Sequence, residues 1–347
     1  MLKPVSDPDP IQQASTARVG FLLLPGFGLL SYAAALEPLR QANRLSGRAL
    51  YSWSHLSLDG KSVIASSGTE IAVDHEVGAQ HRFDIVIICA ATGARYIDDA
   101  GLMRWLRRLA QTRRTLIIGL SGGAFPLARA GLLKGRRVTL HWEDAPAFAE
   151  AFVALDVSLR LFEFDRSRAT CAGGVATIDL MHALIADAHG RGLADAVTER
   201  FLHGGVRDGA TPQRLDLRAR LGVGHPKLLR VLAQMEGQLD EAAQPAALAE
   251  LAGLSVRQLE RLFRQHVGSS IGAHSRALRL DRARQLLRGT SLSVLDVAVA
   301  CGFVSPSHFS RAYREVYGQS PGRERVVPRH LDPVAEGRRT KAAMMSS

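Results

Sequence analysis

The apolar residues of the first two hundred positions follow two alternating spacings. Continuous apolar runs, typical of buried strands, occupy residues 18–24, 83–90 and 115–120. Over residues 29–43 and 98–112 the apolar residues instead recur every third or fourth position, as they do on a helix face. The alternation continues with strands expected at 136–142, 158–165 and 168–172 and helices expected at 122–130, 145–152 and 175–190. This order predicts an α/β domain whose mainly parallel sheet is flanked by helices.

The pattern changes near residue 207. Residues 207–226 are polar, contain glycine and proline and have little strand character, so we interpret them as an interdomain linker. Beyond this stretch the apolar residues keep the helical spacing. We therefore expect a flexible tail at 1–17, the α/β domain at 18–206, the linker at 207–226, an all-α domain at 227–330 and a second flexible tail at 331–347.

The all-α segment contains an internal repeat. In each copy a short apolar helix ends at a glycine, and after a tight turn a serine begins a second helix. This is the arrangement of a helix-turn-helix module, whose second helix is the recognition helix that enters the major groove of DNA. Seven matched pairs are each 50 residues apart: Ser255/Ser305, Leu259/Phe309, Arg261/Arg311, Phe263/Tyr313, Gly268/Gly318, Ser270/Ser320 and Gly272/Gly322. The repeat predicts two helix-turn-helix subdomains.

The distribution of charge supports the same interpretation. Of 347 residues, 46% are apolar and 22% are charged, which is an ordinary globular composition. The net charge of +11 favours an anionic partner. Residues 245–330 contain 13 arginines, no lysine and 6 acidic residues, so this quarter of the chain carries +7 of that total. We therefore expect the repeat to bind double-stranded DNA.

Several polar side chains are candidate DNA contacts. Arginine and glutamine can each form paired hydrogen bonds with a base edge, and the repeat places Arg261 and Arg311 equivalently. For each candidate on the recognition helices, a phosphate contact or plain solvent exposure remains the alternative, whereas the arginines between the copies are candidates for phosphate contacts. The helix between the copies is expected to hold the recognition helices about 34 Å apart, in successive major-groove faces. The candidates are Arg257, Gln258 and Arg261 on the first recognition helix, Ser307, His308 and Arg311 on the second, and Arg279, Arg282 and Arg284 between them.

The repeat resembles a known family. With "LRLDRARQLL" between its copies and "VAVACGFVSPSHFSRAYREVYGQSPGRER" at its end, it is similar to the DNA-binding domain of the AraC/XylS transcriptional regulators. The resemblance covers about 90 residues. Ile271 stands where the family usually has proline, and His274 where it usually has an aromatic residue. Both departures bear on local packing between the copies.

A second motif concerns the α/β domain. Residues 119–123, Gly-Leu-Ser-Gly-Gly, form the G-x-S-x-G pattern that presents a serine nucleophile at a sharp strand-to-helix turn, the elbow. A catalytic serine needs a positioned general base, and the histidines that follow, His182, His189 and His203, lie in helix-like segments. Ser121 is therefore a nucleophile, part of a ligand pocket, or a structural turn. We expect the ligand pocket.

The α/β domain also has a resemblance. "FLLLPGFGLLSYAAALEPLRQAN", "GLSGGAFPLARAGLLKGRRVTLHWE" and "RATCAGGVATIDLMHALI" are similar to the class I glutamine amidotransferase-like (PfpI/GlxA-type) domain, which has a flavodoxin-like fold. Enzymes of this group carry cysteine where this chain has Ser121, which implies a catalytically inactive sensor. Relatives that fuse this domain to an AraC-type module typically activate genes for catabolism of small nitrogen compounds, such as amino acids, betaine or carnitine.

The candidate pocket is assembled around the elbow. Backbone N–H groups at the start of the helix after Ser121 suit a carboxylate, and aromatic faces nearby suit a quaternary ammonium. Glu37 matches the acidic position that lies near the elbow in the amidotransferase-like family. We therefore expect a zwitterionic inducer bound by Phe27, Glu37, Ser121, Gly122, Phe125, His141, Trp142 and Glu143.

Other features exclude further chemistry. Cys89, Cys171 and Cys301 are widely separated without metal-ligand spacing, so we expect a reducing cytoplasm, with no metal, no cofactor and no catalytic residue. The N-terminal stretch lacks the apolar core of a signal peptide, and no run approaches the length of a membrane span.

The sequence therefore predicts a ligand-responsive transcriptional activator. Its expected partners are promoter DNA, the inducer, RNA polymerase and a second copy bound through the N-terminal domain. The alternative is an amidotransferase-like or serine hydrolase that uses Ser121 and carries a DNA-targeting module.

Overall fold

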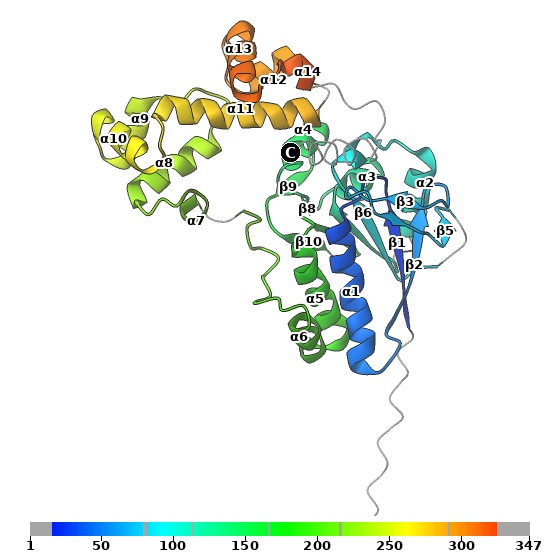
Figure 1. Ribbon diagram of the computed structural model, residues 1–347. Helices are drawn as coiled ribbons and strands as arrows, with labels where there is room; N and C mark the ends of the chain where they lie inside the picture. Colours follow the sequence, from blue (N-terminus) through cyan, green and yellow to red (C-terminus); the bar gives the residue numbers. More distant parts are fainter. Residues whose placement is uncertain are drawn as a thin grey trace, which may run out of the picture. The chain divides into compact units, whose positions relative to one another are not determined.

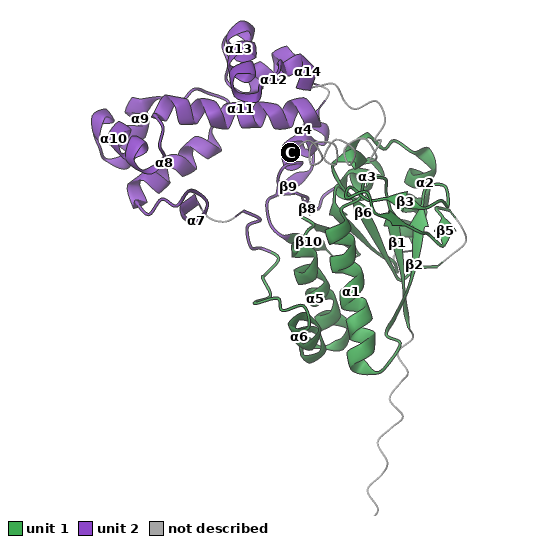
Figure 2. Ribbon diagram, viewed as in Figure 1, with its two compact units in different colours: residues 1–132, 162–209 green, residues 133–161, 210–347 purple. Residues whose placement is uncertain are grey.

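Figure 1 shows the computed structural model, which contains the expected α/β and all-α parts together with elements that were not expected, at residues 51–76 and 191–199. The structure describes residues 16–78, 82–112, 114–165, 167–214, 217–290 and 292–324, so the expected tails lie almost entirely outside the described residues. The chain divides into two compact units, coloured in Figure 2. Unit 1 comprises residues 1–132 and 162–209, and unit 2 comprises residues 133–161 and 210–347. Residues 133–161, expected within the α/β domain, thus belong to unit 2.

Unit 1 is built on a seven-stranded sheet in the order β10-β11-β7-β6-β1-β2-β5. All neighbouring strands are parallel except β10 and β11, which confirms the mainly parallel sheet. Every side chain of the central strand β6 is buried, which explains its continuous apolar run. The strands are β1 (Ala17–Leu23), β2 (Tyr51–Ser57), β5 (His75–Glu76), β6 (Ile85–Ala90), β7 (Leu116–Ser121), β10 (Phe162–Asp165) and β11 (Arg168–Cys171), with a separate hairpin of β3 (Val63–Ile64) and β4 (Glu70–Ile71).

Helices accompany this sheet in two groups. α1 packs against α5 and α6, side by side in Figure 1, and α2 packs against α3. Asp99 caps the N-terminus of α2, and its carboxylate accepts the Leu102 N–H at 2.6 Å. The helices of unit 1 are α1 (Leu29–Ser46), the 3₁₀ helix η1 (Thr92–Tyr96), α2 (Ala100–Gln111), α3 (Ala124–Arg129), α5 (Ala176–His189) and α6 (Arg191–Glu199).

Unit 2 begins with a small parallel pair, β8 (Arg137–Thr139) and β9 (Asp156–Ser158), and the helix α4 (Ala145–Ala151). The expected linker is attached to this pair. The Gln213 amide N–H₂ donates to the Thr139 hydroxyl and to the carbonyls of Leu140 and Arg160 at 2.8–2.9 Å. This part of the linker is therefore held by specific hydrogen bonds.

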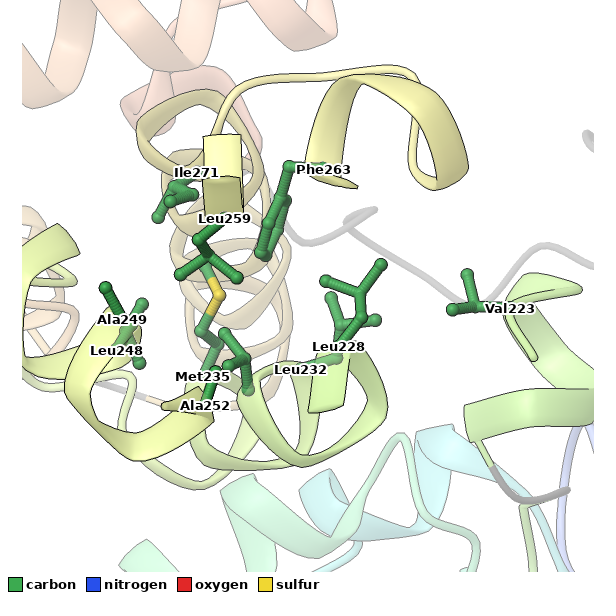
Figure 3. Close-up of a cluster of buried hydrophobic side chains, with 11 residues drawn as sticks. Val223, Leu228, Leu232, Met235, Leu248, Ala249, Ala252, Leu259, Phe263 and Ile271 are labelled. Atoms are coloured by element: carbon green, nitrogen blue, oxygen red, sulfur yellow. The ribbon is translucent and has the colours of Figure 1, made fainter. Parts of the chain in front are cut away.

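The remainder of unit 2 is helical and contains the two predicted helix-turn-helix modules. Module 1 packs α8, α9 and α10 around one cluster, and Figure 3 shows Leu259 and Phe263 of α10 pointing toward Met235 and Leu232 of α8. Module 2 has its own cluster, around Phe309 and Tyr313. The helices are α7 (Leu217–Leu221), α8 (Pro226–Gly237), α9 (Pro245–Ala252), α10 (Val256–His266), α11 (Ile271–Gly289), α12 (Val294–Ala300), α13 (Pro306–Tyr317) and α14 (Pro321–Glu324).

The two departures from the AraC/XylS pattern both fit the core of module 1. Ile271 is the first residue of α11 and is fully buried in the module 1 cluster. The His274 ring packs edge-on against Phe263, with ring centroids 5.9 Å apart, and so takes the place of an aromatic side chain. Burial lowers the pKa of His274, which favours the neutral ring.

Candidate nucleic-acid interface and ligand site

The recognition helix of module 1 is α10, and its N-terminus is fixed by a capping box. The Ser255 hydroxyl oxygen accepts the Gln258 N–H at 3.3 Å, while the Gln258 side-chain oxygen accepts the Ser255 N–H at 2.8 Å. Leu259 and Phe263 are buried, which leaves Arg257 and Arg261 exposed as predicted. Gln258 is exposed too, but its oxygen already serves the cap, so a paired contact with a base would require opening the capping box.

The recognition helix of module 2 is α13, which is capped differently. The Ser305 hydroxyl oxygen accepts the His308 N–H at 3.3 Å, and Pro306 occupies the first helical position in place of a reciprocal side-chain bond. Ser307, His308 and Arg311 are exposed. The six candidates on the recognition helices are thus accessible, and their contacts with DNA stay predictions.

Two further arginines of these helices lie outside the predicted set. Arg264 and Arg314 are exposed near the ends of α10 and α13, at equivalent positions of the repeat. Arg264 lines a surface hollow together with Ser255, Arg257, Gln258, Glu260 and Arg261. Helical spacing could have identified both, because each lies three residues beyond Arg261 or Arg311 on the open face.

Arg279, predicted to contact DNA, is a structural residue instead. It is buried, its Nη1 donates to the Gly302 carbonyl at 2.7 Å, and its guanidinium lies 4.5 Å from the Phe303 ring centroid. These contacts join α11 to the turn of module 2. The prediction was wrong because the expected arginine side of α11 is covered at this position by the turn before α13.

The other two arginines of α11 are also partly engaged. Burial lowers the pKa of Arg282, which is only partly exposed. Arg284 Nε donates to the Glu324 carboxylate at 3.3 Å, and its guanidinium lies 4.5 Å from the Tyr317 ring centroid. Arg284 therefore holds α14 against α11, and the role of Arg282 at DNA stays a prediction.

The elbow of unit 1 has the strained geometry that its motif indicates. Ser121 ends β7 with φ 51°, in the left-handed region that serine rarely adopts. At Gly122 a Cβ atom would lie 2.1 Å from the Ala91 carbonyl oxygen, so only glycine fits this turn. The local packing therefore fixes the position of the Ser121 side chain.

A second serine lies beside the elbow. A Cβ atom on Gly173 would approach the Ser121 Cβ to 2.8 Å and the Ser31 Oγ to 3.0 Å, so both serines border the same backbone segment. The Ser31 hydroxyl oxygen accepts the Gly174 N–H at 2.7 Å. Sequence reasoning missed Ser31, although its place in the first turn of α1, just beyond the carboxyl end of β1, was a usable signal.

The other predicted pocket residues of unit 1 are not arranged as an open pocket. Phe27 and Phe125 are 0% and 1% exposed, so neither ring offers a free face. Glu37 accepts hydrogen bonds from the Arg40 guanidinium at 2.6–3.1 Å. It lies six residues beyond Ser31 along α1, about 9 Å of helix rise, so Ser31 and not Glu37 is the α1 residue beside the elbow.

The turn offers fewer free amide groups than expected. α3 is only six residues long. The Gly123 N–H already donates to the Leu120 carbonyl at 2.9 Å, and the Phe125 N–H donates to the Gly122 carbonyl at 3.1 Å. Buried Gly122 thus shapes the turn, while Ser121 is partly exposed and Ser31 is only 6% exposed.

His141, Trp142 and Glu143 lie in unit 2, whereas Ser121 lies in unit 1. They follow β8, which ends at Thr139 and is shorter than predicted. His141 Nδ1 lies 3.8 Å from the Glu143 carboxylate. The Arg214 guanidinium lies 4.6 Å from the Trp142 ring centroid, so this ring already contacts a cation.

The histidines considered as a general base have other partners. His182 Nε2 lies 2.8 Å from Asp195 Oδ1, and His203 Nε2 lies 3.0 Å from Asp179 Oδ1. The His189 ring packs edge-on against Tyr51. Within the described ranges, no histidine side chain is hydrogen-bonded to the Ser121 hydroxyl, so the structure contains no assembled serine-histidine pair there.

The cysteines and the possible metal ligands were also located. Cys89, Cys171 and Cys301 are buried free thiols, and burial raises the pKa of Cys171 to about 12 and that of Cys301 to about 11. Among the described residues, no group of three or more His, Cys, Asp or Glu side chains is placed to hold a metal ion. No described helix is both long and apolar enough to cross a membrane.

Comparisons with known proteins assign both parts of the chain. Residues 248–325 match a helix-turn-helix domain family, and residues 17–185 match the DJ-1/PfpI family. The chain is 45% identical to the HTH-type transcriptional regulator CdhR of Pseudomonas aeruginosa, over 88% of this chain and 91% of that protein. It is 44% identical to the regulator GbdR of the same species, over 91% and 86% of the two chains. The regulator GlxA of Rhizobium meliloti is 42% identical over 88% and 94%.

Proposed function

The chain belongs to the AraC family of helix-turn-helix transcriptional regulators that carry an N-terminal DJ-1/PfpI domain, and from this premise we propose that unit 1 senses a small zwitterionic inducer at its elbow. As a member of this family it is a transcriptional regulator, and its helix-turn-helix domain binds DNA. Inducer binding changes transcription from the bound promoter.

The observation that carries the sensor proposal is the strained Ser121 beside Ser31. A non-glycine residue at φ 51° costs on the order of 1–3 kcal/mol, and such strain clusters at active sites and ligand clamps. The second hydroxyl and the close approach of Gly173 give this strained residue a polar, tightly packed setting. The two hydroxyls suit the carboxylate of an amino acid or betaine. Relatives with this domain architecture typically regulate the catabolism of amino acids, betaine or carnitine, which supports a cationic group at the other end of the ligand.

A thermal-shift screen tests the sensor proposal. The probes are amino acids and methylated amines, including glycine betaine, carnitine and arginine, because a ligand of the folded state raises the melting temperature by mass action. Ser31→Val and Ser121→Trp should both abolish the shift given by a positive probe. Ser52→Val is the matched control, because Ser52 is an exposed serine of β2. A shift that survives both elbow variants would place the sensor site elsewhere.

We assign no catalytic role to Ser121. The engagement of His182 and His203 with carboxylates supports this, because a serine hydroxyl without a general base is a weak nucleophile. The strained elbow is the one observation that favours the enzymatic alternative. Turnover of amide or ester substrates by the purified chain, lost in Ser121→Ala, would establish that alternative.

The mode of action completes the proposal. The regulator is an activator that recruits RNA polymerase. It acts as a homodimer through its N-terminal domain. The family resemblance supports both statements. Transcription in vitro from the bound promoter should rise when the protein and inducer are added to RNA polymerase. Sedimentation of the full chain should give twice the mass of 37.5 kDa. A fall in transcript, or a monomer at all concentrations, would reject the corresponding statement.

A further inference from the structure

The two helix-turn-helix modules differ by one residue in their turns. Their recognition helices match at a separation of 50 residues, with Leu259 and Phe263 equivalent to Phe309 and Tyr313. Their first helices instead match at a separation of 49 residues. The pairs at 49 are Leu248/Val297, Ala249/Ala298 and Ala252/Cys301, which are all buried, followed by Gly253/Gly302. Module 2 therefore has one additional residue between its two helices.

Backbone hydrogen bonds identify the additional residue. The Leu254 N–H donates to the Ala249 carbonyl at 3.0 Å, and the Phe303 N–H donates to the Ala298 carbonyl at 2.9 Å, so Leu254 and Phe303 are equivalent. In module 1, the capping residue Ser255 follows Leu254 directly. In module 2, Val304 separates Phe303 from the capping residue Ser305.

The apolar side chain of Val304 is not buried within the protein. Its relative exposure is 101%, whereas Phe303 beside it is 4% exposed and packs against Phe309. A fully exposed branched apolar residue gains no burial in the folded chain. The apolar side chain of Val304 is therefore available for contact with a partner.

The place of Val304 indicates which partner that is. It lies two residues before α13, next to the capping residue Ser305, and Pro306 and Ser307 at the start of this helix are also exposed. In helix-turn-helix proteins the N-terminal end of the recognition helix contacts the base edges in the major groove. The apolar group on those edges is the C5-methyl of thymine.

We propose that Val304 is a specificity-determining residue that contacts a thymine methyl group in the half-site bound by module 2. The inference rests on DNA binding by the helix-turn-helix domain. Module 1 has no residue in the same place: its recognition helix begins with Val256, which is 41% exposed, and then presents Arg257, a base or phosphate donor. The two modules thus read their half-sites with different chemistry, although they derive from one repeat.

The test replaces thymine by deoxyuridine, which lacks only the C5-methyl group. The full chain is first used to select its preferred duplex from random-sequence DNA, and every thymine of that duplex is then replaced singly. For the wild-type protein, one replacement should weaken binding about fourfold, the effect expected for one buried methyl group. Val304→Ala should bind the unmodified duplex about fourfold more weakly and lose no further affinity with uracil at that position.

A matched variant and a folding control complete the experiment. Val316→Ala changes a valine of α13 that is 56% exposed at the other end of the helix, and it should keep the wild-type response to every uracil. The melting temperature of Val304→Ala should equal that of the wild type, because the side chain is fully exposed. A wild-type protein insensitive to every replacement, or a Val304→Ala protein that keeps the wild-type sensitivity, would overturn the proposal. Failure to select any duplex would instead contradict DNA binding itself.

Discussion

The carboxylate of Asp179 is fully buried and receives three hydrogen bonds from Arg207. The Arg207 backbone N–H donates to Oδ1 at 2.9 Å, and its guanidinium donates to Oδ2 at 2.6 and 3.1 Å. Asp179 lies in the first turn of α5, and Gly173, which packs beside Ser121 of the elbow, lies shortly before that helix. Helix α5 thus binds, through Asp179, the residue at which the expected linker begins.

Removing one partner of this buried pair should destabilise unit 1. Arg207→Met should lower the free energy of unfolding by about 2 kcal/mol, because it leaves a buried carboxylate with less compensation. We expect less than the 3–5 kcal/mol typical of fully buried pairs, since Arg207 is 40% exposed and His203 still contacts Asp179. Urea unfolding followed by the fluorescence of Trp53 and Trp105, both in unit 1, measures the change.

Arg18→Met serves as the comparison for that measurement. Arg18 and Asp84 form an exposed ion pair with a separation of 3.8 Å, whose loss should change stability by less than about 1 kcal/mol. Equal effects of the two substitutions would contradict the special role of the buried pair.

Arg279 and Arg311 should give opposite results when substituted. Arg279→Met removes the bond to the Gly302 carbonyl and should lower the stability of module 2 by about 1–3 kcal/mol, because it leaves a partly buried acceptor without this donor. Arg311→Ala should leave stability unchanged and weaken specific DNA binding by about 1–3 kcal/mol, as should Arg261→Ala. Thermal unfolding followed by circular dichroism and titration by fluorescence anisotropy distinguish the two roles. Equal losses on specific and random DNA would reassign Arg261 and Arg311 to phosphate contacts.

Arg264 and Arg314 should contact phosphates rather than bases. Each alanine variant should weaken binding by a similar factor on specific and random duplexes, and it should reduce the slope of log affinity against log salt by about 1. An affinity series over salt concentration measures this slope. A loss confined to the specific duplex would show that these arginines take part in base recognition.

His274 should make module 1 sensitive to acid. Burial lowers its pKa, with the Glu236 carboxylate acting in the opposite direction, so below about pH 6.5 the unfolded chain binds more protons than the folded one. The contribution of neutral His274 to the free energy of unfolding is complete above about pH 6.5. It is lost as the pH falls toward the lowered pKa of this residue. His274→Phe should therefore remove part of the loss of stability between about pH 7 and pH 5.

The control for this experiment is His266→Gln, which changes an exposed histidine of α10. Denaturant unfolding at each pH, followed by circular dichroism, should give the control the wild-type pH dependence. A His274→Phe protein with the wild-type pH profile would contradict the prediction.

The periodicity of apolar residues sufficed to predict the fold class. The run 83–90 contains the central strand β6, which is apolar throughout because both of its faces are buried. The repeat predicted two modules because the same buried positions recur in both copies. The seven-residue strand β2 was missed because polar residues interrupt its sequence, YSWSHLS, so that it contains no continuous apolar run. The division at 133 and 161 depends on long-range contacts that no local pattern contains.

The candidate sites were predicted less completely. Exposure of Arg257, Arg261 and Arg311 follows from helical spacing. Spacing could not show that Arg279 is covered, because the turn that covers it lies more than twenty residues away along the chain. Spacing could not show that Ser31 and Ser121 both lie near Gly173 either, because the fold brings together segments that are ninety residues apart in the chain. Glu37 was favoured over Ser31 because a carboxylate is chemically conspicuous, although its partner is Arg40.

Sequence-specific DNA binding by the two modules is the central claim, and one titration tests it most directly. Fluorescence anisotropy of the full chain, measured from about 0.05 to 0.2 M salt, compares the selected duplex with a random duplex of the same length. We predict a specific affinity at least about 10³-fold above the non-specific affinity, with both falling steeply as salt rises. Equal affinities for the two duplexes, or binding that does not depend on salt, would contradict the account.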